Sequence, residues 1–205
     1  MSSELPSPHW RSHRLQGYDY TQAGAYFITI CAHERAMLFG QIVAEAMQLN
    51  ALGEVVAEEW IKSATIRQEI ELDSWIVMPN HLHGILVIKD SGQSAALDHP
   101  TPKQPAQRPQ RKPHSVGAFI AGFKSAVTRR TNELRQTPAP LWQPNYYDHI
   151  IRTEVALNNI RHYIRDNPRR WAADRENPDC LPGQLTIFTD LQASGYNSKH
   201  WYTPE

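Results

Sequence analysis

Two short apolar segments lie on either side of the dipeptide Pro79-Asn80, namely IELDSWIVM at residues 70–78 and HLHGILVIK at residues 81–89. Their isoleucine, valine and tryptophan content favours β-strands, and a Pro-Asn pair favours a turn. We therefore expect two adjacent strands joined by a tight turn. The second segment is almost continuously apolar after its first residues, which predicts a central strand of a sheet.

The predicted central strand begins with two histidines, His81 and His83. The side chains of a strand alternate between its faces, so both imidazoles share one face and Leu82 points to the other. Two neutral imidazoles on a rigid strand can bind a metal ion. The same spacing also fits two polar-face residues on a half-exposed strand, so the pair alone does not define a metal site.

The remaining hydrophobic pattern predicts further strands and helices. Alternation predicts strands and apolar residues at helical spacing predict helices, with Asn50, Ser115 and Thr153 as N-caps. The last helix is expected to stop at Pro168, because the residue before a proline avoids helical geometry. The expected strands cover residues 25–32, 38–43 and 146–152, and the expected helices cover residues 50–67, 115–134 and 153–167.

This order of elements predicts an α+β domain, an antiparallel sheet with helices packed mainly on one face. The other face of the sheet would then be free to carry a site. We expect the folded domain to span residues 25–168, after an N-terminal arm at 1–24 and before an irregular C-terminal tail at 169–205. Residues 90–113 contain five prolines and few large apolar side chains, which predicts a flexible insertion.

Charge is balanced over the whole chain, with 21 basic and 21 acidic residues, but it is unevenly distributed. Between Lys103 and Arg135 the chain has eight basic residues and a single acid. Such a segment can bind the phosphates of a nucleic acid. It can equally be a solvated linker and helix face balanced by the acids Glu54, Glu58 and Glu59, and charge alone does not separate the two interpretations.

Cysteine usage and hydropathy indicate a soluble protein of the cytoplasm. Cys31 and Cys180 lack the spacing of a metal-binding or redox motif, which argues against a disulfide framework. The N-terminal segment has no apolar run of the kind found in signal peptides, and no stretch reaches the length of a membrane span. We therefore expect no membrane partner.

The last predicted helix contains Tyr163 and, four residues later, Asn167. Residues four apart share a helix face, so the phenol and the amide would project together. Taken singly, Tyr163 could be an ordinary core aromatic residue and Asn167 could be a C-terminal cap.

Three stretches, MPNHLHGILV, LWQPNYYDHIIR and IRHYIRDNP, occur in this order between residues 78 and 168. They resemble the signature stretches of the REP-associated tyrosine transposases, a branch of the single-tyrosine HUH transposases of small insertion sequences. The resemblance runs from about Tyr26 to Pro168 and leaves residues 90–113 unmatched. It implies a ferredoxin-like antiparallel sheet, with a His-hydrophobic-His motif on a central strand and one nucleophilic tyrosine on an adjacent helix.

Carried over residue by residue, the resemblance implies that His81 and His83 bind a metal ion and that Tyr163 is the nucleophile. Asn167 takes the position where relatives have a third ligand, an amide or carboxylate oxygen.

The rival nucleophiles are Tyr146 and Tyr147. The resemblance places them on a strand, with Asp148 and Arg152 as structural or DNA-facing partners, which favours Tyr163 as the nucleophile.

The implied activity is metal-dependent DNA strand transfer by a transposase. Mixed nitrogen and oxygen ligands suit Mg²⁺ or Mn²⁺, although two imidazoles also suit zinc. Attack of the tyrosine on a phosphodiester gives a 5′-phosphotyrosine link, with single-stranded or hairpin (REP-like) DNA as the expected substrate. Such a protein would be associated with the nucleoid. The candidate DNA-binding residues are Arg111, Lys112, Lys124, Arg129, Arg130 and Arg152.

Two other functions stay open. A DNA-binding module of the same fold would recognise hairpins without productive cleavage, although the intact His81, His83 and Tyr163 argue against it. A zinc-dependent hydrolase that does not act on DNA could combine the histidine pair with Asp73 or Asp148, and its activity would survive Tyr163→Phe. The sequence does not define the target DNA sequence, nor whether the protein acts as a monomer or a homodimer.

Overall fold

The computed structural model describes residues 15, 17–90, 112–136, 138–174 and 176–180. Most of the predicted N-terminal arm, of the insertion at 90–113 and of the C-terminal tail lies outside these residues. The limits expected for the folded domain therefore stay predictions.

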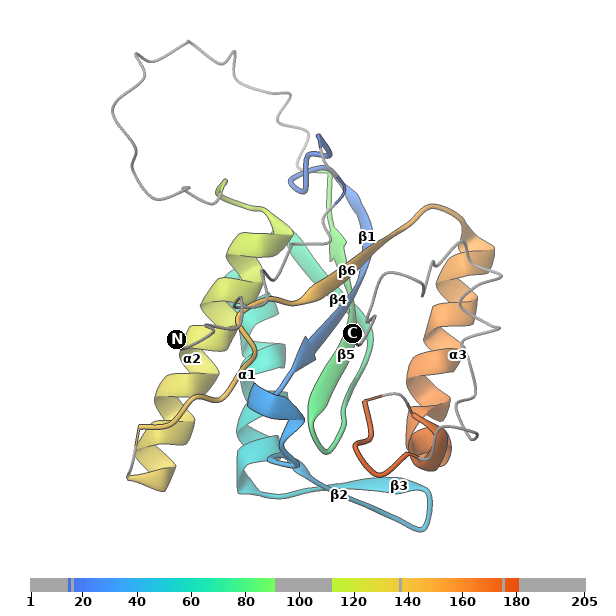
Figure 1. Ribbon diagram of the computed structural model, residues 1–205. Helices are drawn as coiled ribbons and strands as arrows, with labels where there is room; N and C mark the ends of the chain where they lie inside the picture. Colours follow the sequence, from blue (N-terminus) through green and yellow to red (C-terminus); the bar gives the residue numbers. More distant parts are fainter. Residues whose placement is uncertain (1–14, 16, 91–111, 137, 175, 181–205) are drawn as a thin grey trace, which may run out of the picture.

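The described part of the chain contains a four-stranded antiparallel sheet with strand order β4-β5-β1-β6 (Figure 1). Strand β5 lies between β4 and β1, which confirms the predicted central position. Strands and helices follow one another as in the ferredoxin-like arrangement, so the predicted α+β class is also confirmed. The strands of this sheet are β1 (Gly24–Cys31), β4 (Ile70–Val77), β5 (His81–Ile88) and β6 (Tyr147–Ile151).

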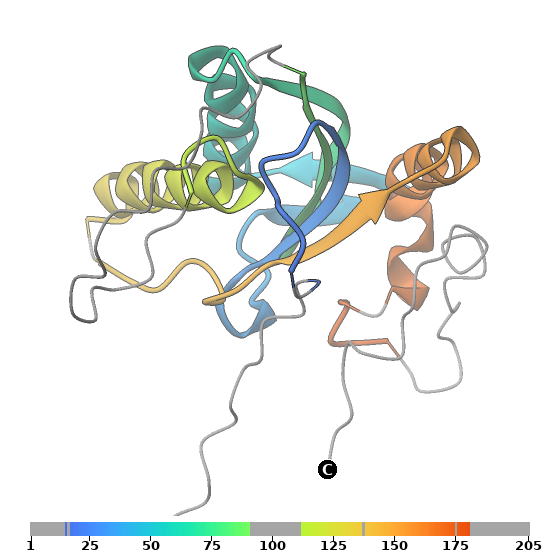
Figure 2. The same cartoon turned by 90° about the horizontal axis from the view of Figure 1, so that it is seen from above.

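Two helices, α1 (Ala51–Ile66) and α2 (Val116–Arg135), cover one face of this sheet (Figure 2). The larger hydrophobic core lies between these helices and the sheet, with Trp60 of α1 fully buried in it. A Cβ atom at Gly84 of β5 would lie 2.5 Å from the Trp60 ring. Only glycine therefore lets the indole pack directly onto the central strand.

The third helix, α3 (Glu154–Arg170), lies on the opposite face of the sheet (Figure 2). It buries Ile160 and Ile164 against Phe27 and Ile85, which form a second, smaller core. The second face is therefore partly covered, and the side chains at the start of β5 lie in a closed layer between sheet and helix.

Side-chain caps begin all three of these helices at the predicted positions. Asn50 accepts hydrogen bonds from the backbone of Leu52 and Gly53, Ser115 accepts one from Ala118, and Thr153 accepts one from Ala156. Each cap satisfies an N–H group that has no partner inside its own helix.

The prediction that the last helix stops at Pro168 is wrong, since α3 continues through it to Arg170. A proline within the last turn removes only one helical hydrogen bond. Burial of Asn167 and Pro168 offsets that loss, and the backbone N–H of Trp171 bonds to the Pro168 carbonyl oxygen. A short 3-10 helix, η2 (Trp171–Ala173), then reverses the chain.

The single strand expected at 38–43 is a two-stranded hairpin, β2 (Gly40–Val43) with β3 (Ala46–Leu49). Its turn residues Ala44 and Glu45 have positive φ angles of 48° and 60°. Turns of this kind usually contain glycine or asparagine, so the sequence carried no signal for this one. A further 3-10 turn, η1 (His33–Arg35), precedes the hairpin.

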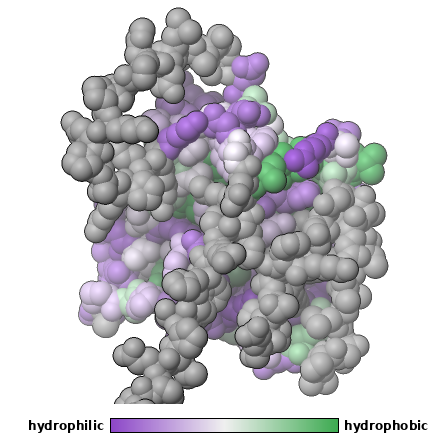
Figure 3. Space-filling view, turned by 45° about the horizontal axis from the view of Figure 1, so that its top comes forward, coloured by the Kyte–Doolittle hydropathy of each residue, from purple (hydrophilic) through white to green (hydrophobic). Residues whose placement is uncertain are grey.

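Hydrophilic side chains alternate with small apolar patches on the face shown in Figure 3. Among the described residues, no helix is both long and apolar enough to span a membrane.

An ion pair ties α3 to the edge strand β4, since Arg161 Nη2 lies 2.6 Å from Asp73 Oδ2. The hydrogen bonds from Arg161 lower the pKa of Asp73. We therefore expect Asp73→Asn to lower the free energy of unfolding by about 1 kcal/mol at pH 7. The ion pair stabilises the folded state only while the Asp73 carboxyl is ionised. The difference between the two proteins should therefore shrink as the pH falls below about 4.

Urea unfolding at pH 7 and at a pH below about 4 measures this difference in the free energy of unfolding, with Glu71→Gln as the control. The Glu71 pair with Lys89 has side chains 63% and 51% exposed, so its loss should cost less than about 0.5 kcal/mol. Equal destabilisation by the two variants would contradict the structural role of Arg161.

Candidate active site

The two histidines at the start of β5 lie on the face that α3 covers. His81 and His83 are almost fully buried, and their ring centroids are 4.4 Å apart. The ring of Tyr163, on α3, lies 5.2 Å from the His83 ring, centroid to centroid. The strand and the helix thus bring two imidazoles and one phenol into a single buried cluster.

The hydrogen bonds of Asn80 define the tautomer of His81. Asn80 Nδ2 donates to the backbone oxygens of Arg35, at 3.1 Å, and Glu176, at 2.6 Å. Its Oδ1 atom therefore faces His81 Nδ1, at 2.8 Å, and can only accept a proton there. His81 Nδ1 carries the hydrogen, which leaves the buried Nε2 atom with a lone pair and no partner among the described residues.

His83 is held from both sides of its ring. Its Nδ1 atom lies 2.8 Å from the Thr29 hydroxyl, and its Nε2 atom lies 3.2 Å from the Tyr163 hydroxyl. Burial lowers the pKa of His83 to about 3, and burial followed by the charge of His83 lowers that of His81 well below its usual range. Both imidazoles are therefore neutral at pH 7, the form that binds metal ions.

Tyr163 is 8% exposed and its ring meets Phe27 edge-on. Burial raises the pKa of its hydroxyl well above the usual value, and the charges of Asp174 and Glu176 raise it further. The hydroxyl is thus protonated in this state, and its ionisation requires positive charge close by.

Asn167 and Asp174 complete the cluster. Asn167 Nδ2 donates to Asp174 Oδ2 at 3.2 Å, while the buried Oδ1 atom has no hydrogen-bond partner in the part of the chain that the structure describes. Asp174 Oδ1 accepts from the backbone N–H of Glu176. Burial raises the pKa of Asp174 to about 6.

These donors fit a divalent metal ion. One ligand atom each from His81, His83 and Asp174 lies within 4.8 Å of the others. His81 Nε2 and Asn167 Oδ1, which have no hydrogen-bond partner among the described residues, also indicate a metal site, because buried polar atoms in folded proteins usually have partners. Imidazole nitrogens with amide and carboxylate oxygens suit Mg²⁺, Mn²⁺ or Zn²⁺.

The segment after α3 forms one wall of the cluster. The Trp171 ring lies 6.0 Å from the His81 ring, and the Glu176 carboxylate pairs with Arg35 Nε at 3.0 Å. Sequence reasoning treated this segment as an irregular tail and missed both Asp174 and Asn80. Asn80 stands beside the histidine pair and could have been noticed, whereas no pattern marks Asp174.

The alternative site residues lie elsewhere. Tyr147 shares the face of His83, but Thr29 of β1 pairs with both, so Tyr147 is two strands away, roughly 10 Å. Asp148 pairs with Ile28, which points into the larger core on the other face. Asp73 is bound by Arg161, outside the cluster.

Three of the six candidate DNA-binding residues have internal partners. Lys112 pairs with Asp19, and Arg130 pairs with Glu58 and Glu59, two of the acids expected to balance the basic segment. Lys124 Nζ donates to the backbone oxygens of Gln143 and Asn145. This favours a structural role for these side chains.

The remaining candidates are Arg129, Arg152 and Arg111. Arg129 is exposed on α2, the layer opposite the site, where it borders a shallow depression. Arg152 is exposed directly before the N-cap of α3, the helix that carries Tyr163. Arg111 lies outside the described residues.

Comparisons with known proteins place the chain in a family and a fold. No protein-family model matches it. It is 37% identical over 171 residues to a Haemophilus influenzae protein described as uncharacterized, covering 82% of this chain and 92% of that protein. The chain belongs to the same family as that protein.

A solved structure of a REP-associated tyrosine transposase bound to a REP hairpin is similar to this chain at a TM-score of 0.53 and 18% identity. The similarity covers 78% of this chain and 74% of that one. At this level of identity the similarity shows the fold alone, which this chain shares with that transposase.

Proposed function

We propose that this protein is a metal-dependent transposase that cleaves and rejoins DNA strands through a covalent bond to Tyr163. The observation that carries the proposal is the position of the Tyr163 hydroxyl, 3.2 Å from His83 Nε2 in a cluster with two lone-pair donors for a metal ion. The His83 imidazole beside this hydroxyl is neutral and buried, and the neighbouring His81 Nε2 atom has no hydrogen-bond partner among the described residues.

In the proposed reaction the Tyr163 oxygen attacks the phosphorus of a phosphodiester. A bond from this oxygen to phosphorus forms while the bond to the 3′ oxygen breaks. The phenol loses its proton and the departing 3′ oxygen gains one, so the products are a 5′-phosphotyrosine and a free 3′-hydroxyl. The ester linkage is retained, so the reverse step can join strands without a nucleotide cofactor.

His81 Nε2, His83 Nε2 and Asn167 Oδ1 would hold the ion, and Asp174 offers a fourth, carboxylate ligand. When bound, a divalent ion supplies positive charge for the phosphate oxygens and favours the phenolate. His83 Nε2 has one lone pair, so it cannot both accept the Tyr163 proton and bind an ion. With His83 Nε2 committed to an ion, the Tyr163 hydroxyl would be without this hydrogen bond and would be available as the nucleophile.

Asn80 has a positioning role in this proposal, since it holds the hydrogen of His81 on Nδ1. We expect Asn80→Ala to weaken Mn²⁺ binding by about 10- to 100-fold, as other losses of outer-shell partners do. Titration calorimetry with Mn²⁺ measures this. The matched control is Asn177→Ala, which loses a bond to the Trp171 backbone but none to an imidazole. Equal affinity in both variants would contradict the role of Asn80.

We propose single-stranded or hairpin DNA as the substrate. The support is the HUH fold, since the solved neighbour was bound to a REP hairpin. Arg152 and Arg129 are the exposed candidates for phosphate contacts.

Incubation of the purified protein with labelled hairpin oligonucleotides and Mg²⁺ or Mn²⁺, followed by a denaturing gel, tests the proposal. A slowly migrating protein–DNA species that EDTA prevents is the expected result. Hairpin binding without cleavage under either metal would favour the recognition module instead.

A zinc-dependent hydrolase is a second candidate, because two histidines and an aspartate are a ligand set that zinc enzymes use. The carboxylate would be Asp174 rather than Asp73 or Asp148. Hydrolysis that persists in Tyr163→Phe and requires Zn²⁺ would support this alternative.

A further inference from the structure

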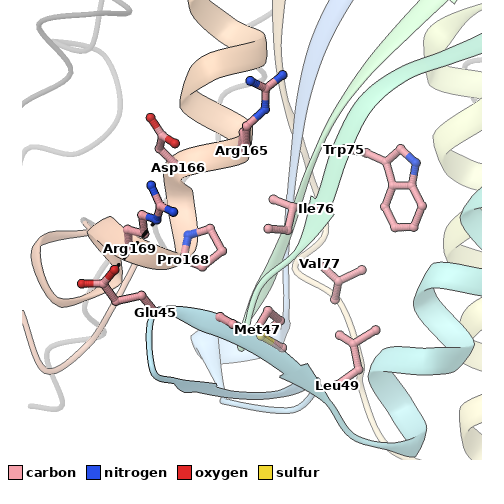
Figure 4. A pocket seen from close by; sticks show the side chains of 11 residues that line it. Glu45, Met47, Leu49, Trp75, Ile76, Val77, Arg165, Asp166, Pro168 and Arg169 are labelled. Atoms are coloured by element: carbon pink, nitrogen blue, oxygen red, sulfur yellow. Dashed lines mark ion pairs between the residues drawn. The ribbon is translucent and has the colours of Figure 1, made fainter.

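A cavity of about 490 Å³ lies beside the candidate active site, between the β2-β3 hairpin, the edge strand β4 and the C-terminal half of α3 (Figure 4). Its volume falls within the range of small-molecule and nucleotide sites. The proposed reaction assigns no role to this cavity.

The walls of the cavity are apolar where the two layers meet. Figure 4 shows Ile76 pointing from β4 toward α3, with Met47 of β3 below and Pro168 of α3 opposite. Apolar side chains on two sides can hold a nucleic-acid base between them.

The rim is charged. Arg165 is exposed and has no ion pair or hydrogen bond with any residue that the structure describes. Among the described residues, Arg169 has only a long contact of 3.8 Å, to Glu45, and both of these side chains are 71% exposed. Such a pair contributes little energy and can exchange for another anion.

The cavity adjoins the cluster of His83 and Tyr163. Ile76 lies directly opposite His83 in the β4-β5 register, so the two side chains are neighbours on one face. On the helix, Asp166 at the cavity follows Tyr163 by three residues, so these two positions are neighbours on the helix surface. A group held in the cavity therefore lies beside the strand and helix positions that carry His83 and Tyr163.

We propose that this cavity binds one unpaired nucleotide of the DNA strand that enters the active site, an inference that rests on the proposed function. The base lies between the apolar walls, and Arg165 and Arg169 contact the adjoining phosphates. Glu45 and Asp166 stand at the same rim, so a free phosphate is a poor ligand. A nucleotide offers acceptors to the arginines and base donors to the carboxylates.

The test is fluorescence anisotropy with two labelled oligonucleotides, a hairpin alone and the same hairpin with a short single-stranded extension. The Tyr163→Phe background with Mg²⁺ keeps the DNA intact. Arg165→Ala combined with Arg169→Ala removes the cationic rim, and Ala46→Phe, at an exposed position that lines the cavity, fills it without a change of charge.

In both variants the affinity for the extended hairpin should fall by about tenfold, to that of the bare hairpin. The affinity for the bare hairpin should stay unchanged. The control Arg129→Ala, an exposed arginine on the opposite layer, should affect both oligonucleotides alike. An undiminished extension effect, or equal weakening for both oligonucleotides, would overturn the subsite. If the protein with an intact cavity bound neither oligonucleotide, the proposed function would be overturned, and this inference with it.

Discussion

Tyr163→Phe is expected to abolish the covalent protein–DNA species and to reduce strand cleavage by at least about 10³-fold. The substitution removes the attacking oxygen, and removal of a nucleophile costs that much or more in enzymes with covalent intermediates. The phenyl ring keeps the packing against Phe27, and the lost hydrogen bond to His83 costs only about 1 kcal/mol. A quantitative cleavage gel over a time course measures the effect.

The matched control is Tyr147→Phe, on the same face of the sheet but two strands from His83. It should retain cleavage within about threefold and still form the adduct. If Tyr147→Phe abolished the adduct and Tyr163→Phe did not, the assignment of the nucleophile would be wrong.

The second large effect is expected at the imidazoles. His83→Ala should weaken Mn²⁺ binding by more than about 100-fold and abolish cleavage, because it removes a ligand outright. Paramagnetic resonance of free Mn²⁺ in a titration measures the affinity without any need for DNA. Circular dichroism shows whether the variant is folded. If His83→Ala does not fold, His83→Asn replaces it, because the larger side chain leaves a smaller cavity in the core.

His149→Ala serves as the control for this prediction. His149 pairs with Phe27, so it is an imidazole on the same sheet face, and burial lowers its pKa too. Its removal should leave Mn²⁺ affinity within about twofold. Mn²⁺ binding that is unchanged in both variants would show that the histidine pair is structural.

The fold could be predicted largely from local patterns. The apolar run after His83 indicated the central strand, and the caps at Asn50, Ser115 and Thr153 were where the structure has them. Such features depend on neighbours within a few residues. The β3 strand was missed because its turn places ordinary residues at positive φ.

The histidine pair and Tyr163 could be nominated from spacing and resemblance, whereas the surroundings that govern their chemistry could not. Asp174 reaches the cluster only because α3 continues through Pro168 and the chain then reverses. The basic residues show the same difficulty. The partners of Arg130 lie more than 70 residues away on α1, and only the tertiary structure brings them together.

The most direct test of the account is the chemical identity of the protein–DNA link. The adduct is treated with nuclease, digested with trypsin and analysed by mass spectrometry. Cleavage after arginine isolates Tyr163 on the peptide 162–165 and the rivals Tyr146 and Tyr147 on the peptide 136–152. The account predicts a nucleotide mass on 162–165. A nucleotide on 136–152, or DNA cleavage with no modified peptide, would contradict it.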